Sequence, residues 1–253
     1  MTKEAKFKRR LLLAVDAVGY GARDDQRQHA LQANLLHLLD LAAARAGLHR
    51  DAWAKQPQGD GELAVLPADE SEREQMIIDG FVRELNNALI AHNRDLRDEA
   101  RLRLRLAIHF GSVAEAENGY SGQGVVMVSR LADSTSVKKA LELTHASNLA
   151  VILSERVFNE SVLQRHTSLD PNLFRTVEVR NKELCETAYL YLPGHDVHAV
   201  PLPPENSAAP DAGRGSDPRV KEMKEAPRPT TVETTIHGNV NIPNGVIGMV
   251  WNR

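Results

Sequence analysis

Two aspartates lie where strands are predicted to end, in surroundings that suit phosphate chemistry. Asp16 follows the apolar run 11–15 and precedes a glycine-containing turn, so its carboxylate is expected at the mouth of a buried strand. Asp60 lies in a Gly-Asp-Gly tip of a predicted hairpin, before the apolar run 63–66. Two such carboxylates can converge on a hard divalent cation and a nucleoside triphosphate. Taken singly, Asp60 also suits an ordinary turn and Asp16 a helix cap.

The composition limits the other functions that the chain can have. Its 253 residues, 42% of them hydrophobic, allow one large domain or a domain with a tail. A net charge of −3 argues against a general nucleic-acid binder. The single cysteine, Cys185, excludes an intramolecular disulfide and a cysteine-cluster metal site. The apolar run 11–15 after the basic start is too short for a secretion signal or a membrane span, so we expect a cytoplasmic protein with no membrane partner.

Apolar spacing predicts alternating strands and helices as far as residue 192. Strands are predicted at 11–15, in the hairpin 51–66, and at 102–108, 149–153, 174–179 and 187–192. Helices are predicted between Asp24 and Gly47, over 69–89, through Arg130, and at 137–143 and 155–163. The order β-α-β-β-α-β, followed by further elements, predicts an α+β sandwich with helices on one face of a mainly antiparallel sheet.

The composition changes near Pro193. Nine of the twelve prolines lie at or after this position, and residues 195–229 are rich in Pro, Ala and charged residues, which predicts a disordered linker. Residues 230–253 regain hydrophobicity, with Val and Ile among Gly and Asn. This tail suits strand addition or a stacked cross-β contact with a protein partner, while a tail that packs back on the domain or stays disordered is the alternative. The expected domains are therefore 1–194, 195–229 and 230–253.

Three blocks, in order along the chain, resemble the class III nucleotidyl (adenylate/guanylate) cyclase catalytic domain. They are Val-Asp-Ala-Val-Gly-Tyr-Gly at 15–21, Gly-Asp-Gly at 59–61, and Arg-Leu-Ala-Ile-His-Phe-Gly at 105–111 with Gly-Gln-Gly-Val at 122–125 and Ser-Arg-Leu at 129–131. The resemblance covers about residues 10–194. It implies the ferredoxin-like β-α-β-β-α-β sandwich of a divergent bacterial cyclase.

The resemblance also implies a two-metal site shared between two subunits. Two Mg²⁺ or Mn²⁺ ions would be held by Asp16, Ala17 and Asp60, and backbone amides around Ala17, Val18, Gly19, Tyr20 and Gly21 would bind the phosphates. The ribose 3′-hydroxyl would attack the α-phosphate and release pyrophosphate. Arg130 matches the family's transition-state arginine, which the partner subunit supplies, so a homodimer is implied.

The sequence departs from the family pattern where the nucleoside should bind. Val126 stands at the position of the asparagine that orients the ribose, and Gln56 at that of the purine-reading lysine. The segment 122–124 also lacks the aspartate that accompanies this lysine, so the base-reading pair is not that of an adenylyl cyclase. Gln56 carries a donor and an acceptor and would read another base edge. Relatives in this superfamily that cyclise pyrimidine nucleotides occur in bacterial anti-phage signalling, so a pyrimidine nucleotide is also a candidate substrate.

Two functions are therefore expected from the sequence. The first is a nucleotidyl cyclase that makes a cyclic nucleotide signal in bacterial signalling. The second is a catalytically impaired, cyclase-derived nucleotide-binding or scaffold module, recruited through residues 230–253. The chain has neither a His-Glu-x-x-His motif nor a P-loop, which argues against a zinc hydrolase and a P-loop NTPase. A structural role is expected for His109.

Overall fold

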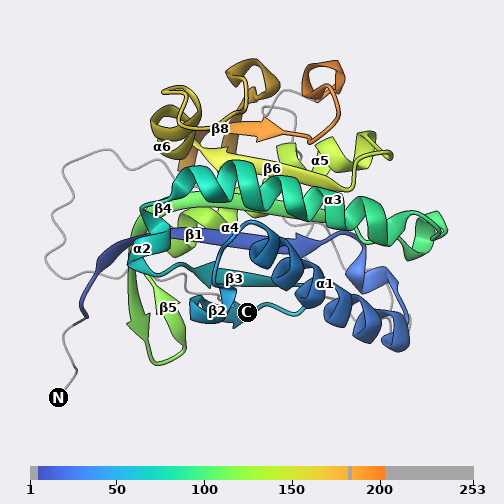
Figure 1. Cartoon of the computed structure of the whole chain (residues 1–253), viewed down its shortest axis with the longest axis horizontal. Coiled ribbons are helices and arrows are strands. Elements are labelled where there is room, and N and C mark those ends of the chain that lie inside the picture. The colour runs from blue at the N-terminus through green and yellow to red at the C-terminus, as the bar shows by residue number, and fades with distance from the viewer. Residues whose placement is uncertain (1–4, 182–183, 203–253) are drawn as a thin grey trace, which may run out of the picture. The chain divides into compact units, whose positions relative to one another are not determined.

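One sheet runs through the residues that the computed structural model describes, which are 5–181 and 184–202 (Figure 1). The strand order is β2-β3-β1-β4-β6-β8-β7, and β5 pairs with β4. Strands β4 and β6 are parallel, and the other neighbouring pairs are antiparallel. The strands are β1 (Lys8–Ala17), β2 (Ala54–Pro57), β3 (Gly61–Val65), β4 (Leu104–Ala116), β5 (Gly119–Ser121), β6 (Leu149–Ser154), β7 (Arg175–Asn181) and β8 (Leu184–Tyr191).

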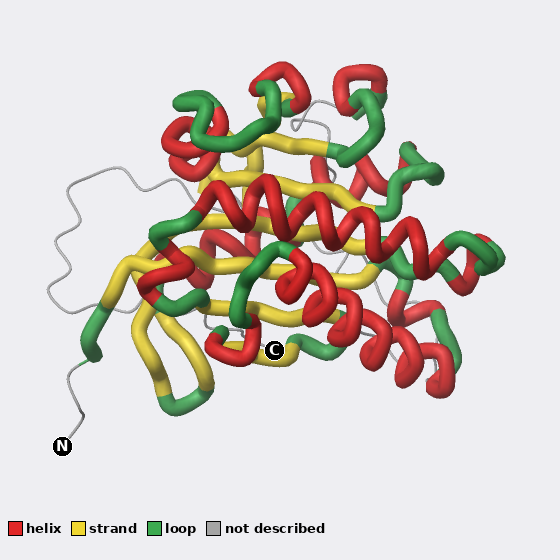
Figure 2. The backbone as a smooth tube through the Cα atoms, in the orientation of Figure 1, coloured by secondary structure: helices red, strands yellow, loops and turns green. Residues whose placement is uncertain are grey.

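Helices cover this sheet, and the two longest run across the face that is turned to the viewer in Figure 2. The α-helices are α1 (Asp25–Arg45), α2 (Ala68–Ser71), α3 (Val82–Asn93), α4 (Gln123–Ala132), α5 (Thr135–Leu143) and α6 (Glu155–Val157). Two of the described segments are π-helical. Met76–Phe81 runs directly into α3, and Phe158–Val162 follows directly after α6. Among the described residues, no helix is long and apolar enough to cross a membrane.

The expectation of helices on one face of the sheet is wrong, and β1 shows why. Leu11, Leu13 and Val15 lie in a core formed with α1 and α3. Leu12 and Ala14 lie in a second core, on the other face, formed with α4 and α5. All five side chains are at most 5% exposed. An unbroken apolar run is stable only in a strand that is covered on both faces, so the run itself required a second helical layer.

The order of the first elements follows the prediction. The chain runs β1-α1-β2-β3-α3-β4, which confirms the β-α-β-β-α-β order. Helix α1 begins after Asp24, whose carboxylate accepts a hydrogen bond from the amide of Arg27 at 2.9 Å, and it ends before Gly47 as predicted. Strand β5, which has only three residues, was not predicted.

The second core extends beyond the domain end that was predicted at residue 194. Val197 is 1% exposed and Val200 is 6% exposed, and both pack in this core. The predicted linker therefore begins with residues that belong to the folded part of the chain. Residues 203–229 of that linker, and the tail 230–253, lie outside the described residues.

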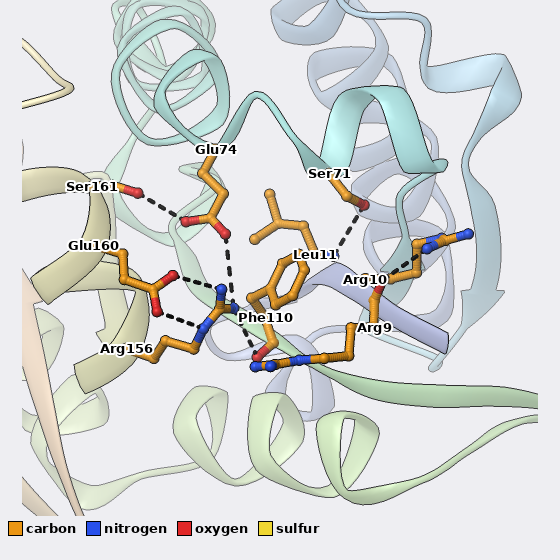
Figure 3. Close-up of polar contacts among 9 residues, drawn as sticks. All are labelled: Arg9, Arg10, Leu11, Ser71, Glu74, Phe110, Arg156, Glu160 and Ser161. Atoms are coloured by element: carbon orange, nitrogen blue, oxygen red, sulfur yellow. Dashed lines mark hydrogen bonds and ion pairs between the residues drawn. The ribbon is translucent and has the colours of Figure 1, made fainter. Parts of the chain in front are cut away.

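A polar cluster beside the N-terminal end of β1 joins Glu74, which lies two residues before the segment Met76–Phe81, to α6 and the segment Phe158–Val162 (Figure 3). The Ser161 hydroxyl donates a hydrogen bond to the Glu74 carboxylate at 2.8 Å. Arg156 lies 3.9 Å from Glu74 and forms two hydrogen bonds with Glu160, at 2.9 and 2.6 Å. Its guanidinium carbon lies 3.9 Å from the centre of the Phe110 ring. The cluster thus fixes both helical segments over the same end of the sheet.

We predict that the free energy of unfolding of Glu74→Gln, compared with that of the unmodified protein, increases as the pH rises from 4 to 7. Burial raises the pKa of Glu74 above its usual value, although Ser161 and Arg156 oppose the shift. The folded state therefore binds the proton more tightly than the unfolded state, and stability is lost as pH rises through the unfolded and then the folded pKa. Urea unfolding of both proteins at several pH values measures this difference. The same comparison with Glu142→Gln, an exposed surface change, should show less pH dependence, and equal dependence would contradict the prediction.

The approach of β3 to β1 depends on the absence of a side chain at Gly61. A Cβ atom at this position would lie 2.1 Å from the carbonyl oxygen of Val15 and 3.0 Å from the Cα atom of Asp16. Backbone atoms in the centre of a sheet cannot yield by such distances. Glycine at position 61 therefore permits the pairing that brings Asp60 beside Asp16.

We predict that Gly61→Ala destabilises the fold by about 1–3 kcal/mol, because the new methyl group forces β3 away from β1. Gly80→Ala is the matched control, since its Cβ would meet only the Ala46 side chain, at an ordinary 3.5 Å. This control should lose little stability, because alanine also restricts the unfolded chain. Chemical denaturation of the full chain measures both changes. Equal stability of the two variants would show that the close contact at Gly61 is not limiting.

Candidate active site

The pairing of β1 with β3 brings the three predicted metal ligands together. Asp16 lies opposite Gly61 in the register of the two strands. The amide of Ala17 donates a hydrogen bond to the carbonyl oxygen of Asp60 at 2.9 Å. The charge of Asp60 also contributes to raising the pKa of Asp16, so the two carboxylates lie close enough to interact. The structure thus places Asp16, Ala17 and Asp60 in one site.

Arg105 of β4 belongs to the same site, although it was not predicted. Its Nε atom lies 2.7 Å from Oδ1 of Asp16, and both side chains are largely buried. Burial raises the pKa of Asp16 above its usual value, and the positive charge of Arg105 opposes this shift. Arg105 lies opposite Asp16 in the β1–β4 register, and its side chain is on the other face of β4 from Leu104 and Leu106. The alternation of polar and apolar residues in the sequence indicates this face. The contact with Asp16 could not be predicted, because it depends on how β1 and β4 are paired.

The donor set of this site fits a hard divalent cation. The described residues contain no cluster of three or more His, Cys, Asp or Glu side chains that could hold a metal ion. Mg²⁺ does not need such a cluster, because it retains several waters and typically binds one or two carboxylates together with substrate phosphates. Asp16 and Asp60 supply these two carboxylates. Arg105 is paired with Asp16, so a cation that binds this carboxylate would have to share or displace the ion pair.

Fewer backbone amides are free to bind phosphate than the sequence analysis predicted. The amide of Ala17 is bonded to the Asp60 carbonyl, and the amide of Val18 donates to the Arg103 carbonyl at 2.9 Å. Both amides are therefore unavailable to a phosphate. In the described part of the chain, the amides of the next three residues have no hydrogen-bond acceptor, and these residues are Gly19, Tyr20 and Gly21. They form the end of a turn that leads into α1, where free amides suit an anion.

Gln56 lies on β2, where its side chain is packed against the β4–β5 hairpin. Its Oε1 atom is buried and has no hydrogen-bond partner within the described residues. A Cβ atom at Gly119 would come within 2.4 Å of this oxygen, so the hairpin backbone rests directly on the amide. No hydrogen bond or ion pair joins Gln56 to Asp16 or Asp60 across the described ranges. The structure therefore does not by itself assign Gln56 a base-reading role.

Helix α4 carries the two remaining positions singled out from the sequence. Val126 is 40% exposed, so no packing requirement explains its aliphatic side chain. Arg130 is partly buried and, among the described residues, makes no hydrogen bond or ion pair. It is also absent from the charges that shift the pKa of Asp16, whereas Lys138 of α5 is one of them. Lys138, which also pairs with Asp133, is a second basic residue near the site that the sequence analysis missed.

His109 has the structural character that was expected. Burial, followed by the nearby charges of Arg156 and Arg9, lowers its pKa to about 4. The imidazole is therefore neutral at neutral pH. It lies against Gly111, where a Cβ atom would come within 2.5 Å of Nε2, and so helps to fix this part of β4.

Comparisons with known proteins find solved structures of cyclase domains that are similar to the chain. No family model and no curated protein matches the chain. An adenylate/guanylate cyclase/hydrolase from Silicibacter pomeroyi is 20% identical, with a TM-score of 0.52, and the match covers 75% of this chain and 99% of that one. The guanylyl cyclase Cya2 is 14% identical, with a TM-score of 0.51 and coverage of 74% and 92%.

A third match is the guanylate cyclase domain of RhGC from Catenaria anguillulae, whose structure was solved in complex with GTP. It is 14% identical, with a TM-score of 0.50 and coverage of 74% of this chain and 97% of that one. Identities this low establish the fold and leave the chemistry to the residues. The described part of the chain therefore has the fold of the class III adenylate and guanylate cyclase catalytic domains.

Proposed function

We propose that the protein is a nucleotidyl cyclase, which converts a nucleoside triphosphate into a cyclic nucleotide and pyrophosphate. The observation that carries this proposal is the placement of Asp16, near the end of β1, beside Asp60, which directly precedes the paired strand β3, with the free amides of residues 19–21 in the turn that follows β1. Carboxylates for cations and amides for phosphate oxygens are the two requirements of a triphosphate site. The cyclic product would serve as a signal in a bacterial cell.

Each part of the site has a distinct task in the proposed reaction. Asp16, Asp60 and the carbonyl oxygen of Ala17 would hold two Mg²⁺ or Mn²⁺ ions. These ions supply charge that favours the ionised 3′-hydroxyl and neutralises the phosphates. The amides of residues 19–21 donate hydrogen bonds to the β- and γ-phosphates. A bond forms between O3′ and the α-phosphorus while the bond to the pyrophosphate oxygen breaks, and the hydroxyl proton passes to solvent.

Positive side chains would stabilise the charge that builds up at the α-phosphate. Arg105 already lies at the site through its ion pair with Asp16. We assign the same task to Arg130 of the partner subunit in a homodimer. Within the described residues, Arg130 makes no hydrogen bond or ion pair, so its side chain is available to a second copy of the chain.

The alternative is a module that binds a nucleotide without turning it over and is recruited to a partner through residues 230–253. Two observations favour it. Val126 presents an aliphatic side chain where a ribose would need a hydrogen-bond partner. Gln56 is held under the hairpin, with its oxygen buried. Both concern the nucleoside half of the site and leave the metal half intact.

We predict that the full-length protein, incubated with Mn²⁺ and each of the four ribonucleoside triphosphates, forms a cyclic product from at least one of them. Asp16→Ala and Asp60→Ala should each abolish this product, because each removes a carboxylate that holds the cations. Asp51→Ala, which changes an exposed aspartate outside the site, is the control and should remain active. Product analysis by mass spectrometry decides the result. No product from any of the four nucleotides, with nucleotide binding retained, would favour the binding module.

We predict that Val126→Asn increases turnover, by up to about a hundredfold, because an amide can position the ribose that valine cannot. The position is 40% exposed on α4, so the change should not disturb folding. Val126→Ala is the matched control, since it shortens the side chain without adding a polar group. A rise in kcat for the asparagine variant alone would identify residue 126 as the weak point of the site. Unchanged kcat in both variants would show that the ribose is oriented elsewhere.

A further inference from the structure

Gln32 of α1 connects two segments of the candidate site. Its Nε2 atom donates a hydrogen bond to the Tyr20 hydroxyl at 2.9 Å and another to the Gly59 carbonyl oxygen at 2.8 Å. Tyr20 lies in the segment that carries the free amides, and Gly59 directly precedes Asp60. One side-chain amide therefore bridges the phosphate-binding turn and the metal-binding turn.

Gln28, one helical turn earlier on the same face of α1, holds only the first of these segments. Its Nε2 atom donates to the carbonyl oxygens of Tyr20 and Arg23, at 3.3 and 2.9 Å. Tyr20 is thus fixed at its backbone by Gln28 and at its hydroxyl by Gln32. Within the described residues, Gln32 is the α1 side chain that also reaches the Asp60 turn.

The Asp60 turn is otherwise attached to the sheet alone. The amide of Ala17 donates to the Asp60 carbonyl, and the amide of Gln58 donates to the Gly61 carbonyl at 2.9 Å. The first bond fixes the turn against β1 on one side, and the second closes the turn itself. The bond from Gln32 fixes it on the other side, against the helix. Without that bond, the tip of the turn would be free to tilt away from the phosphate-binding segment.

We propose that Gln32 is a positioning residue, which sets the distance between Asp60 and the phosphate-binding amides of residues 19–21. This inference rests on the proposed function, because it concerns the same metal and triphosphate site. Both hydrogen atoms of the Gln32 amide are used in the bridge, so no other uncharged side chain of similar length supplies the same pair of donors. A displacement of about 1 Å is enough to weaken metal and phosphate binding.

Mn²⁺ binding to the full-length protein, measured by electron paramagnetic resonance with and without a non-cyclisable triphosphate analogue, tests the proposal. Gln32→Ala should weaken Mn²⁺ binding by about threefold to tenfold, the loss expected from one or two neutral hydrogen bonds. Gln32→Glu keeps the length of the side chain and can accept a hydrogen bond from the Tyr20 hydroxyl, but it cannot donate to the Gly59 carbonyl, so it should also weaken Mn²⁺ binding by detaching the Asp60 turn. Gln26→Ala is the matched control, because Gln26 is exposed on the same helix and makes no described bond.

Tyr20→Phe separates a positioning role from a general loss of stability. This variant removes one of the two bonds that Gln32 donates, so Gln32→Ala should weaken Mn²⁺ binding less in the Tyr20→Phe background than in the unmodified protein. The thermal midpoints of all variants are measured in parallel. Strictly additive effects, or losses of Mn²⁺ affinity that follow the thermal midpoints, would overturn the proposal.

Asp16→Ala distinguishes failure of this inference from failure of the proposed function. If Mn²⁺ binding depends on Asp16 but is unchanged in Gln32→Ala, the positioning role is wrong and the proposed site stands. If the unmodified protein shows no Mn²⁺ binding that depends on Asp16, both are overturned. Asp16-dependent binding that weakens in Gln32→Ala and Gln32→Glu, but not in Gln26→Ala, supports the proposal.

Discussion

The candidate site depends on the pairing of β1 with both of its neighbours. On one side, Gly61 lets β3 approach so closely that the chain reverses beside Asp16. On the other side, β4 places Arg105 opposite the same aspartate. The backbone alone therefore brings two carboxylates and a guanidinium to one end of the central strand. Because the side chains of that strand pack into a different core on each face, a shift of its register would exchange side chains of unlike size between the two cores, so the packing itself protects the geometry.

Much of this arrangement could be predicted from the sequence, and the reason is local. The apolar run 11–15, the Asp24 cap and the Gly-Asp-Gly tip each determine their own conformation, and the structure confirms the elements that they predict. Asp16 and Asp60 were paired through the resemblance to the cyclase domain, and the β1–β3 register is what places Asp16 opposite Gly61, next to Asp60. The apolar run 11–15 also indicated a buried strand, and burial on both faces requires the two helical layers that the structure shows.

The residues that were missed act over long separations in the chain. Arg105 reaches Asp16 through a strand register, and Gln32 reaches Gly59 from a neighbouring helix. Neither carries a motif, because an arginine on a strand and a glutamine on a helix are ordinary surface residues in a sequence. Their role follows only from which elements pack together. The same holds for Gln56, because its position on β2 does not indicate that the β4–β5 hairpin packs on its side-chain amide.

The way the candidate site is built has a consequence for how it can change. The turns that carry Tyr20 and Gly59 are constrained by backbone contacts and by α1, so few substitutions are tolerated there. Val126 lies on an exposed part of α4, where substitutions have little cost in stability. If the chain is a nucleotidyl cyclase as proposed, selection could alter its nucleotide preference at such exposed positions while the turns beside Asp16 and Asp60 are preserved. A change of substrate would then not require the fold to be rebuilt.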